Sequence, residues 1–453
     1  MGARSKYSWV PFRDIGFLVR NRRDMIAIVN EVFNRCGDYA SCGLPGMKGY
    51  LVSHPDAIED ILYTHQDNYV FGEPDWSPYV RSIGRGLIYS DGDEYTRQRR
   101  LVQPSFHGDR LVSFCKVADA SIAALLSRWQ AHAGKIVDMH QEMMDLTLEI
   151  AGRFIFGDAI LPRLKEFGGL SSRILLLATE MYLMPSGRFP WLPTRRQEEF
   201  RQMVSTMDAL LYETIRRARD DSQPDGCVMA ALHHHRNEGL TSKTDVEYPS
   251  DRLMRDLAAA LLGAGHETTA NMLTWTWHLL SENRDERDRL VQELQNTPNL
   301  DKPEAIQALP SLNLVLRESL RLCPPVWLIA RRARKETNVA GYRISPGARL
   351  FISPYLVHHD SRWFDEPERF LPSRFADVDA AARHRFAYIP FGCGARRCVG
   401  QPFAETIGRL VIARLLPHFL PGTVEPKGVQ PDPSFFRPKG GLRMVLHSSS
   451  CDR

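Results

Sequence analysis

One cysteine in this sequence has the surroundings of a metal ligand. The segment 391–400 carries glycines and arginines around Cys398, and a helix with periodic apolar residues is predicted directly after it. A cysteine just before a helix N-terminus meets free backbone N–H groups and the positive end of the helix dipole, which favour the thiolate that a metal needs. Gly394 and Gly400 leave room for a flat cofactor to approach the backbone, and Arg396 is able to pair with a carboxylate. The alternative for any lone cysteine is a small core residue.

A second segment, Ala264-Gly-His-Glu-Thr-Thr, lies inside a long apolar-periodic stretch. Glycines inside a helix cost about 1 kcal/mol each relative to alanine, so Gly263 and Gly265 call for a reason. The hydroxyl of Thr268 can bond back to the carbonyl of Ala264, which bends a helix and opens a pocket beside it. The alternative is a patch of small residues that packs against a neighbouring helix.

Glu318 and Arg321 stand three residues apart on a predicted helix. On an exposed helix such a pair contributes only a few tenths of a kcal/mol. Here the flanking Leu316, Leu320 and Leu322 are apolar, so we predict that the pair faces the interior, where each charge needs a partner.

The elements that must position these residues are mainly helical. Apolar residues recur at three- and four-residue spacing in the stretch ending at Gly157, in the stretch after Ser250 and over 403–415. Short strands are predicted near 50–53 and across 339–353, where glycine and Pro-Gly punctuate alternating residues. No repeat, low-complexity tract or Gly/Ser linker divides the chain. We therefore predict one continuous fold over residues 1–453.

The composition is that of a globular protein. Of its 453 residues, 43% are hydrophobic and 25% are charged, which allows a large core. The 58 Lys and Arg exceed the 54 Asp and Glu by too little for a dedicated nucleic-acid-binding protein. No apolar stretch approaches the ~18 residues that cross a bilayer, and the eight cysteines form neither a disulfide framework nor a CxxC zinc pair. We expect a cytoplasmic protein with no transmembrane anchor and no nucleic-acid partner.

The five positions of the cysteine segment match a known signature. Phe391, Gly394, Arg396, Cys398 and Gly400 follow the pattern Phe-x-x-Gly-x-Arg-x-Cys-x-Gly, and through it and the motifs above the chain resembles the cytochrome P450 family over about residues 50–444. The resemblance implies a mainly α (α+β) fold, in which a large helical lobe and a small antiparallel β-rich lobe hold haem b between them. It makes Cys398 the axial thiolate and places the other four signature residues against the cofactor.

The resemblance also gives roles to the other segments. In Ala264–Thr269, which lies beside the cofactor, it implies that Thr268 hydrogen-bonds to bound oxygen, that Glu267 relays protons and that His266 points outward. Glu318 and Arg321 would join Arg374 in a buried structural network.

Cationic groups hold the haem propionates in the family, and Arg99, Arg331 and Arg396 lie at matching positions. Relatives place Trp or His at the position of Tyr95, whose hydroxyl could reach a propionate in their place.

The implied activity is monooxygenation with O2, and the implied electron donor is a separate ferredoxin or flavodoxin. No flavin or iron–sulfur domain is predicted within the sequence. A basic surface near the cysteine would steer an acidic donor; its members are Arg97, Arg99, Arg100, Arg396 and Arg397.

The expected substrate is a lipophilic small molecule, because the segments that line the pocket in relatives are apolar here. They contain Phe71, Trp76, Tyr79, Ile83, Met181, Tyr182, Met184, residues 326–329, Phe435 and Phe436. Fatty acids, terpenoids, steroids and polyketides all remain open. Two other functions also remain open: a peroxide-using or rearranging haem-thiolate enzyme, and a haem sensor that would need the cysteine but no proton relay.

Overall fold

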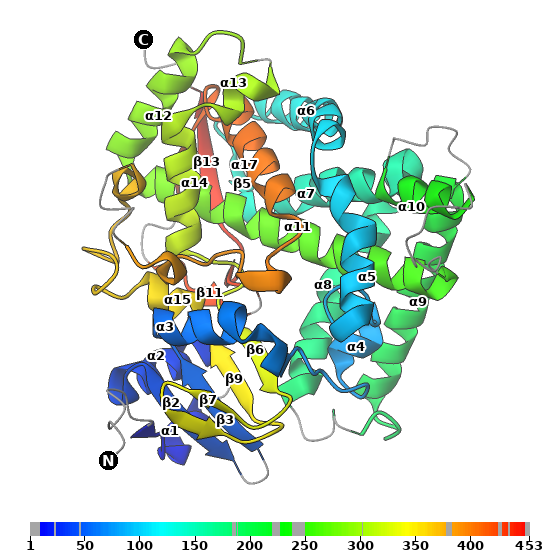
Figure 1. The fold of residues 1–453 in the computed structure, drawn as a ribbon. Helices are drawn as coiled ribbons and strands as arrows, with labels where there is room; N and C mark the ends of the chain where they lie inside the picture. The colour runs from blue at the N-terminus through cyan, green and yellow to red at the C-terminus, as the bar shows by residue number, and fades with distance from the viewer. Residues whose placement is uncertain are drawn as a thin grey trace.

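The computed structural model describes residues 10–21, 24–44, 47–183, 187, 189–219, 227–237, 250–300, 302–376, 383–424, 428–433 and 435–448. Figure 1 shows a large helical lobe and a smaller lobe built around a sheet. This arrangement confirms the predicted mainly α (α+β) class. Met184, one of the residues expected to line the substrate pocket, lies outside the described residues.

The helices of the described residues are α1 (Ile15–Arg20), α2 (Met25–Cys36), α3 (Pro55–Glu59), α4 (Pro78–Ile83), α5 (Gly92–Val102), α6 (Asp109–Gln130), α7 (Met139–Phe156), α8 (Leu164–Leu183), α9 (Arg195–Arg219), α10 (Val228–Asn237), α11 (Asp251–Glu282), α12 (Arg284–Asn296), α13 (Pro303–Gln307), α14 (Pro310–Leu322), α15 (Pro354–His358) and α17 (Gln401–Leu415). The helices predicted before Gly157, after Ser250 and over 403–415 are confirmed as α7, α11 and α17.

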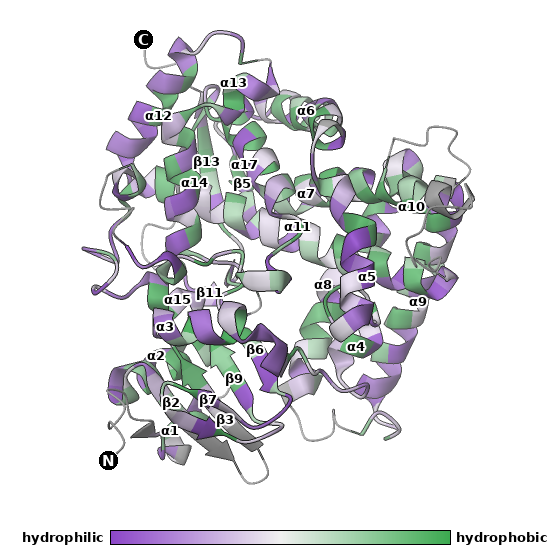
Figure 2. Ribbon diagram, viewed as in Figure 1, coloured by the Kyte–Doolittle hydropathy of each residue, from purple (hydrophilic) through white to green (hydrophobic). Residues whose placement is uncertain are grey.

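Helix α11 runs through the helical lobe (Figure 1). Its N-cap is Ser250, whose hydroxyl accepts a hydrogen bond from the Leu253 amide at 3.2 Å, so one of the unpaired N–H groups of the first turn is satisfied. The helix packs along α7 and continues without interruption to Glu282. Most of its residues are buried, and they lie on all sides of the helix, as expected for a helix in the centre of a large protein. In contrast, the peripheral α12 is largely hydrophilic (Figure 2).

The strands of the described residues are β1 (Val10–Pro11), β2 (Tyr39–Leu44), β3 (Met47–Val52), β4 (Tyr69–Val70), β5 (Ile136–Asp138), β6 (Ile329–Ala333), β7 (Thr337–Val339), β8 (Tyr342–Ile344), β9 (Arg349–Ile352), β10 (Phe419–Thr423), β11 (Pro431–Asp432), β12 (Arg437–Pro438) and β13 (Arg443–Ser448). The strands predicted near 50–53 and across 339–353 are confirmed.

The small lobe contains a six-stranded sheet in the order β1-β2-β3-β9-β6-β4. Most neighbouring strands are antiparallel, but β1 pairs parallel with β2 and β3 pairs parallel with β9. In the register of β6 and β9, Arg331 lies opposite Leu350. This sheet has its own apolar core, separate from the main core of the helical lobe. The sheet therefore forms a second packed body that carries Arg331.

Candidate functional site

The cysteine loop has the conformation that the sequence predicts. Gly394–Arg396 form a single 3-10 turn, and Gly400 is the N-cap of α17, so Cys398 lies just before that helix. The amide of Cys398 donates to the carbonyl of Phe391 at 3.0 Å, which closes the loop. The Cys398 side chain is accessible although protein atoms surround it, as expected for a group that lines an internal cavity. The thiol is therefore open to a ligand.

Two effects act on the Cys398 thiol in opposite directions. Burial raises its pKa above 9.0 and is the larger effect. The N–H groups of Gly400 and Gln401 and the charges of Arg99 and Arg397 lower the pKa. The helix N-terminus thus acts as predicted, but alone it does not make the thiol a thiolate. A bound metal cation would supply the missing stabilisation, because a coordinating thiol is deprotonated by the metal.

Gly394 is required for a reason other than the predicted approach of a cofactor. Its φ is +70°, and a Cβ there would overlap the carbonyl oxygen of Leu62 and come within 2.6 Å of Gln66 Oε1. A side chain is thus excluded by the protein itself. At Gly400 a Cβ would lie 3.9 Å from the Cys398 sulfur and 3.7 Å from Phe106, which are ordinary contacts. Gly400 consequently leaves the space beside the sulfur open.

Arg331 is a half-buried cation that forms no ion pair among the described residues, although the charge of Asp91 acts on it from a distance. Its guanidinium donates to the carbonyl of Ala330 at 2.8 Å and lies 5.8 Å from the Phe71 ring centre. Burial, followed by the nearby charge of Arg396, lowers its pKa from 12.5 to about 10. Buried charges normally have a counter-ion. The environment of Arg331 therefore favours an anionic ligand.

Arg396 does pair with a carboxylate, as the sequence suggested, but with one of the protein's own. It contacts Asp91 at 2.6 Å and also donates to the carbonyl of Ser90. Its guanidinium lies 4.0 Å from the ring centre of Tyr95. The Tyr95 hydroxyl donates to Ala395 O at 2.9 Å and accepts from Arg99 at 2.7 Å. These contacts bring three of the predicted propionate-binding residues, Tyr95, Arg99 and Arg396, together between α5 and the cysteine loop, and Arg331 on β6 is near enough for the charge of Arg396 to act on it.

A short window in α11 is accessible within an otherwise buried helix. Ala264 is exposed and Gly263, Gly265 and Thr268 are partly exposed, whereas 257–262 and 269–277 are buried. The Thr268 hydroxyl donates to the carbonyl of Ala264 at 2.6 Å, which confirms the predicted back-bond. A Cβ at Gly263 would contact nothing within 4 Å. Gly263 therefore borders an open space, whereas Gly265 faces α7, where its Cβ would lie 3.7 Å from Ala151.

The two residues between Ala264 and Thr268 that carry titratable groups are both buried. Burial raises the pKa of Glu267 from 4.5 to about 7; the charge of Arg437 lowers it and that of Asp432 raises it. His266 was expected to point outward, and this is wrong. It is 1% exposed, with Nδ1 hydrogen-bonded to Leu262 O at 3.0 Å. The reason is that α7 packs against α11 at this position, where the Thr147 hydroxyl donates to the carbonyl of His266 at 3.0 Å.

The buried network around Glu318 is confirmed. Glu318 accepts two hydrogen bonds from Arg321, at 2.7 and 2.8 Å, one from Arg374 at 3.0 Å and one from the Leu371 amide at 2.9 Å. Glu318 and Arg321 have no exposed surface. The charges satisfy one another, as buried charges must.

The Cytochrome P450 family profile matches residues 6–449, nearly the whole chain. This protein is a cytochrome P450. Cyclooctatin synthase from Streptomyces melanosporofaciens is 30% identical to it over 414 residues, which cover 90% of this chain and 88% of that protein. Pentalenene oxygenase from Streptomyces avermitilis is 30% identical over 86% of this chain and 85% of its own length. The family and these relatives identify the protein as a cytochrome P450 monooxygenase.

A solved structure with the same fold is the retinoic-acid-bound cyanobacterial CYP120A1. Its TM-score is 0.83, with 23% sequence identity over 95% of this chain and 96% of that chain. At this identity the likeness shows that the two proteins share the cytochrome P450 fold.

As a cytochrome P450, the protein takes haem b with a cysteine thiolate as axial ligand. The described residues fit that cofactor. The accessible thiol of Cys398 is a suitable ligand for iron, and the half-buried Arg331 lacks the directly paired anion that a propionate would provide.

Asp91 is a partner of the site that the sequence did not predict. It holds Arg396 and accepts hydrogen bonds from the amides of Phe71 and Gly72 at 2.9 and 3.1 Å. Asp91 and Arg396 are 305 positions apart, and an aspartate in a polar loop gives no local signal of such a contact. Asp91 therefore joins the cysteine loop to the segment expected to line the substrate pocket.

His358 was also missed. It is fully buried, accepts from the Ile389 amide at 3.0 Å through Nε2 and contacts the carbonyl of Arg321 through Nδ1. It thereby connects the Glu318 network to the start of the cysteine loop.

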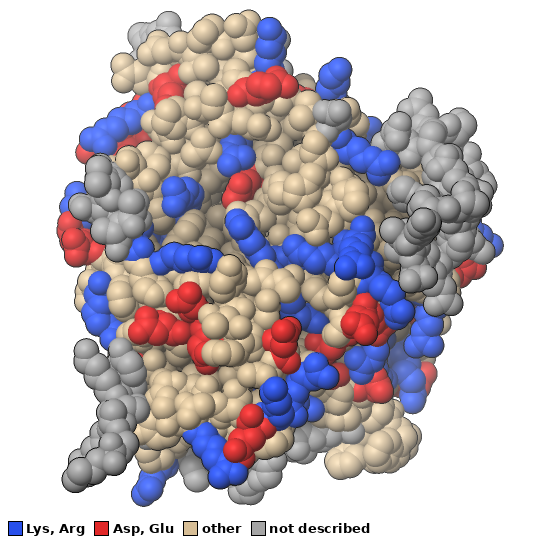
Figure 3. All heavy atoms as spheres, in the orientation of Figure 1, with Lys and Arg blue, Asp and Glu red and all other residues tan. Residues whose placement is uncertain are grey.

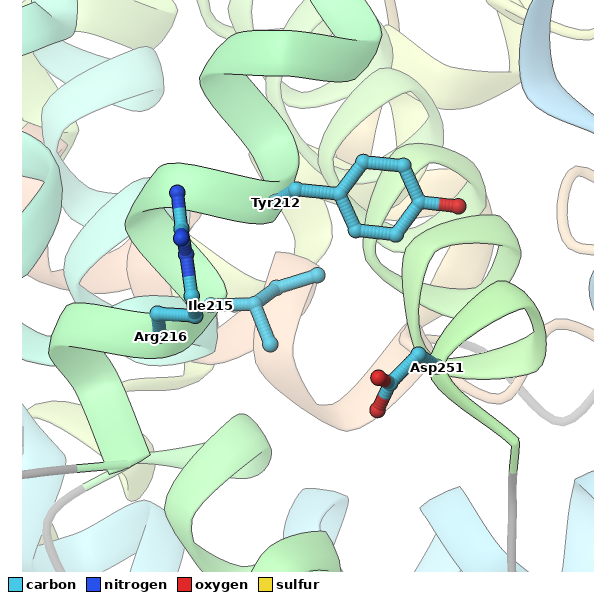
Figure 4. Close-up of a pocket in the computed structure, with 4 residues that line it drawn as sticks. All are labelled: Tyr212, Ile215, Arg216 and Asp251. Atoms are coloured by element: carbon cyan, nitrogen blue, oxygen red, sulfur yellow. The ribbon is translucent and has the colours of Figure 1, made fainter.

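Two pockets lie away from the α11 window. One, of about 320 Å³, lies between α9 and the start of α11 and is lined by Tyr212, Ile215, Arg216 and Asp251 (Figure 4). It contains none of the predicted site residues. The other, of about 910 Å³, lies behind the cysteine loop and includes residues 391–395 and four arginines, Arg317, Arg385, Arg397 and Arg409.

Among the described residues, we find no helix with both the length and the apolar character needed to span a membrane.

Proposed function

We propose that this cytochrome P450 hydroxylates or epoxidises a lipophilic organic compound, with haem bound through Cys398 and electrons from a separate donor. The observation that carries the proposal is the accessible window of α11, in which the partly exposed Thr268 directly follows the buried Glu267 along the helix. A haem protein that only binds a ligand needs the cysteine but has no use for such a pair.

The reaction consumes one substrate molecule, one O2, two electrons and two protons, and it yields the oxygenated product and water. Bound haem supplies the iron at which oxygen is reduced. The protein's own residues must therefore hold the cofactor, deliver protons and admit the substrate.

The residues around the cysteine loop would bind the cofactor. Arg331 is the most direct propionate ligand, because it is half-buried and forms no ion pair among the described residues. The other three residues, Tyr95, Arg99 and Arg396, already have partners in the protein. A propionate would therefore share their polar groups with those partners.

Glu267 and Thr268 would deliver the protons. A carboxyl group with a pKa of about 7 can both accept and donate a proton at neutral pH, which is the property of an efficient proton relay. The Thr268 hydroxyl is partly exposed in the window, and its proton is held by the carbonyl of Ala264. Glu267 would supply protons, and Thr268 would present them beside the iron.

Electrons would come from a ferredoxin- or flavodoxin-type protein, with residues 1–453 acting as one haem domain. Figure 3 shows Lys and Arg side chains in a band across one face of the molecule. Of the five arginines expected there, Arg97, Arg100 and Arg397 are exposed, whereas Arg396 turns inward to Asp91. The exposed three suit an acidic donor that approaches from the Cys398 side.

The segments expected to line the substrate pocket contain a cluster of aromatic rings. The rings of Trp76 and Tyr79 lie 6.2 and 5.3 Å from that of Tyr182, and they join α8 to α4 and the segment before it. Phe436 packs against Trp275 and Tyr355 in the core, so its contribution is structural. Because pentalenene oxygenase is among the relatives, terpenoids are the first class to screen and pentalenene is the first compound.

The test replaces Thr268 by Ala. Electron consumption should continue while product per electron pair falls roughly tenfold or more, because general acid–base catalysis contributes at least that much. Thr269→Ala is the matched control: Thr269 makes the same back-bond, to Gly265 at 2.8 Å, but is buried, so its loss should leave product yield unchanged. Equal behaviour of the two variants would contradict the proposal.

A further inference from the structure

The hairpin of β11 and β12 is fastened to the face of α11 that carries Glu267. Asn271 Nδ2 donates to Phe435 O at 2.9 Å, and Trp275 Nε1 donates to Phe436 O at 2.6 Å. Positions 267, 271 and 275 are four residues apart, so they form one stripe along the helix. Glu267 is therefore the next residue of the stripe that holds the hairpin.

The hairpin presents an ion pair that connects this buried stripe with solvent. Asp432 and Arg437 lie 3.6 Å apart across β11 and β12, and their side chains are 26% and 20% exposed. Both charges act on Glu267, in opposite directions, and in the described residues they are the charged groups that do so. On the α7 side, Arg437 also acts on His140.

Two buried polar atoms belong to the helices beside the hairpin, one on α11 and one on α7. Asn271 Oδ1 and His140 Nδ1 have no hydrogen-bond partner within the described part of the chain. Buried polar atoms of this kind require a donor or acceptor. The region between α11, α7 and the hairpin therefore contains polar groups of the kind that pass protons, whereas most of the surrounding core is apolar.

We propose that the Asp432–Arg437 pair is the proton inlet of the site, with Asp432 exchanging protons with solvent and passing them to Glu267, and Arg437 positioning the two carboxylates. The O–H bond of the Asp432 carboxyl breaks and the Glu267 carboxylate gains the proton; the Asp432 carboxylate then takes a proton from a hydronium ion of the solvent, which leaves water, so protons and charge balance. This inference rests on the proposed role of Glu267 and names the route that supplies it.

The first measurement does not depend on turnover. Infrared spectroscopy follows the C=O band of protonated Glu267, identified by its loss in Glu267→Gln, as pH is varied in the holoprotein. Arg437→Met removes a cation that favours the carboxylate, so the midpoint should rise by about one pH unit. Asp432→Asn removes an anion that disfavours it, so the midpoint should fall. Arg437→Lys keeps the cation and should leave the midpoint near that of the parent.

Asp119→Asn is the matched control. Asp119 is also 26% exposed and also paired with an arginine, Arg414, at 2.8 Å, but it lies on α6 and does not act on Glu267. It should leave the midpoint unchanged. Midpoints that are the same in Arg437→Met, Asp432→Asn and the parent would overturn the proposal.

The second measurement compares two oxidants. With O2 and electrons, Asp432→Asn should give several-fold less product per electron pair. With hydrogen peroxide, which brings both electrons and both protons, the same variant should match the parent. Loss of product with both oxidants would indicate a structural defect and overturn the inlet. A parent protein that binds haem but oxidises nothing would refute the proposed function and leave the infrared result intact, which separates the two failures.

Discussion

At the scale of single residues, Arg331 shows how an unbalanced charge identifies a ligand. The residue is half-buried, desolvation lowers its pKa to about 10, and Arg396 adds a second positive charge nearby. Asp91 forms an ion pair with Arg396 and acts on Arg331 only from a distance, so Arg331 has no ion pair of its own among the described side chains. Folding such a site is costly unless an anion binds.

Replacing Arg331 with Met should therefore weaken haem binding more than it weakens the fold. Hydrogen bonds to charged groups contribute about 1.5–3 kcal/mol, so haem should transfer to a haem-scavenging protein about tenfold faster or more. The rate is measured by the loss of the haem absorbance of the variant. Arg397→Met, at an exposed arginine of the cysteine loop, is the control. If both variants lose haem at the parent rate, Arg331 does not hold the cofactor.

Residue-scale prediction from sequence succeeded where the chemistry is local. The Thr268 to Ala264 bond joins residues four apart, and the Cys398 loop is a contiguous segment. It failed where contacts are long-range or where exposure depends on the whole fold. The Arg396–Asp91 pair and the burial of His266 belong to these cases.

At the scale of elements, the cysteine loop depends on its contact with the π-helical turn of residues Asp60–Thr64. The carbonyl of Leu62 in that turn approaches Gly394 too closely for any side chain. Glycine therefore has a different role in each element. In the cysteine loop, Gly394 allows close packing against the backbone of Leu62, whereas in α11 Gly263 leaves the space beside the helix open.

Substitution of these glycines by Ala should have opposite effects. Gly394→Ala introduces an overlap with backbone at a φ of +70° and should lower the free energy of unfolding by about 2 kcal/mol or more. Gly263→Ala meets nothing within 4 Å and should raise it by up to about 1 kcal/mol, because alanine favours the helix. Denaturant titration of the holoproteins measures both. A neutral Gly394→Ala would show that the loop does not need this contact.

Helices were easier to predict than the sheet for a physical reason. The apolar periodicity that predicts α7, α11 and α17 involves residues that are close together in the sequence. The parallel pairing of β3 with β9 joins segments about 300 residues apart, and no local pattern encodes that choice.

At the scale of the whole molecule, charge is distributed unevenly although the net charge is only +4. Figure 3 shows the basic band on one face, and the exposed Arg97, Arg100 and Arg397 lie on α5 and the cysteine loop. The summed sequence charge concealed this asymmetry, since acidic residues elsewhere cancel it. Such a field accelerates the encounter with a partner of opposite charge.

Reversing charge at Arg97 and Arg100 to Glu should slow reduction by an acidic ferredoxin about tenfold at low ionic strength. The difference should largely disappear at high salt, because ions screen exposed charges. Stopped-flow reduction of the haem measures the rate. The control reverses Arg201 and Arg289, which lie on α9 and α12. Equal slowing by the control pair would contradict docking at the cysteine face.

The claim on which the whole account depends is that Cys398 binds haem iron as a thiolate. The purified protein should be reduced with dithionite under carbon monoxide and its difference spectrum recorded, beside that of Cys398→Ala and of Cys393→Ala as the neighbouring control. We predict a strongly red-shifted ferrous carbonyl band in the parent and in Cys393→Ala, and its loss in Cys398→Ala. A band typical of histidine ligation in freshly folded parent protein, or a red-shifted band that persists in Cys398→Ala, would contradict the account.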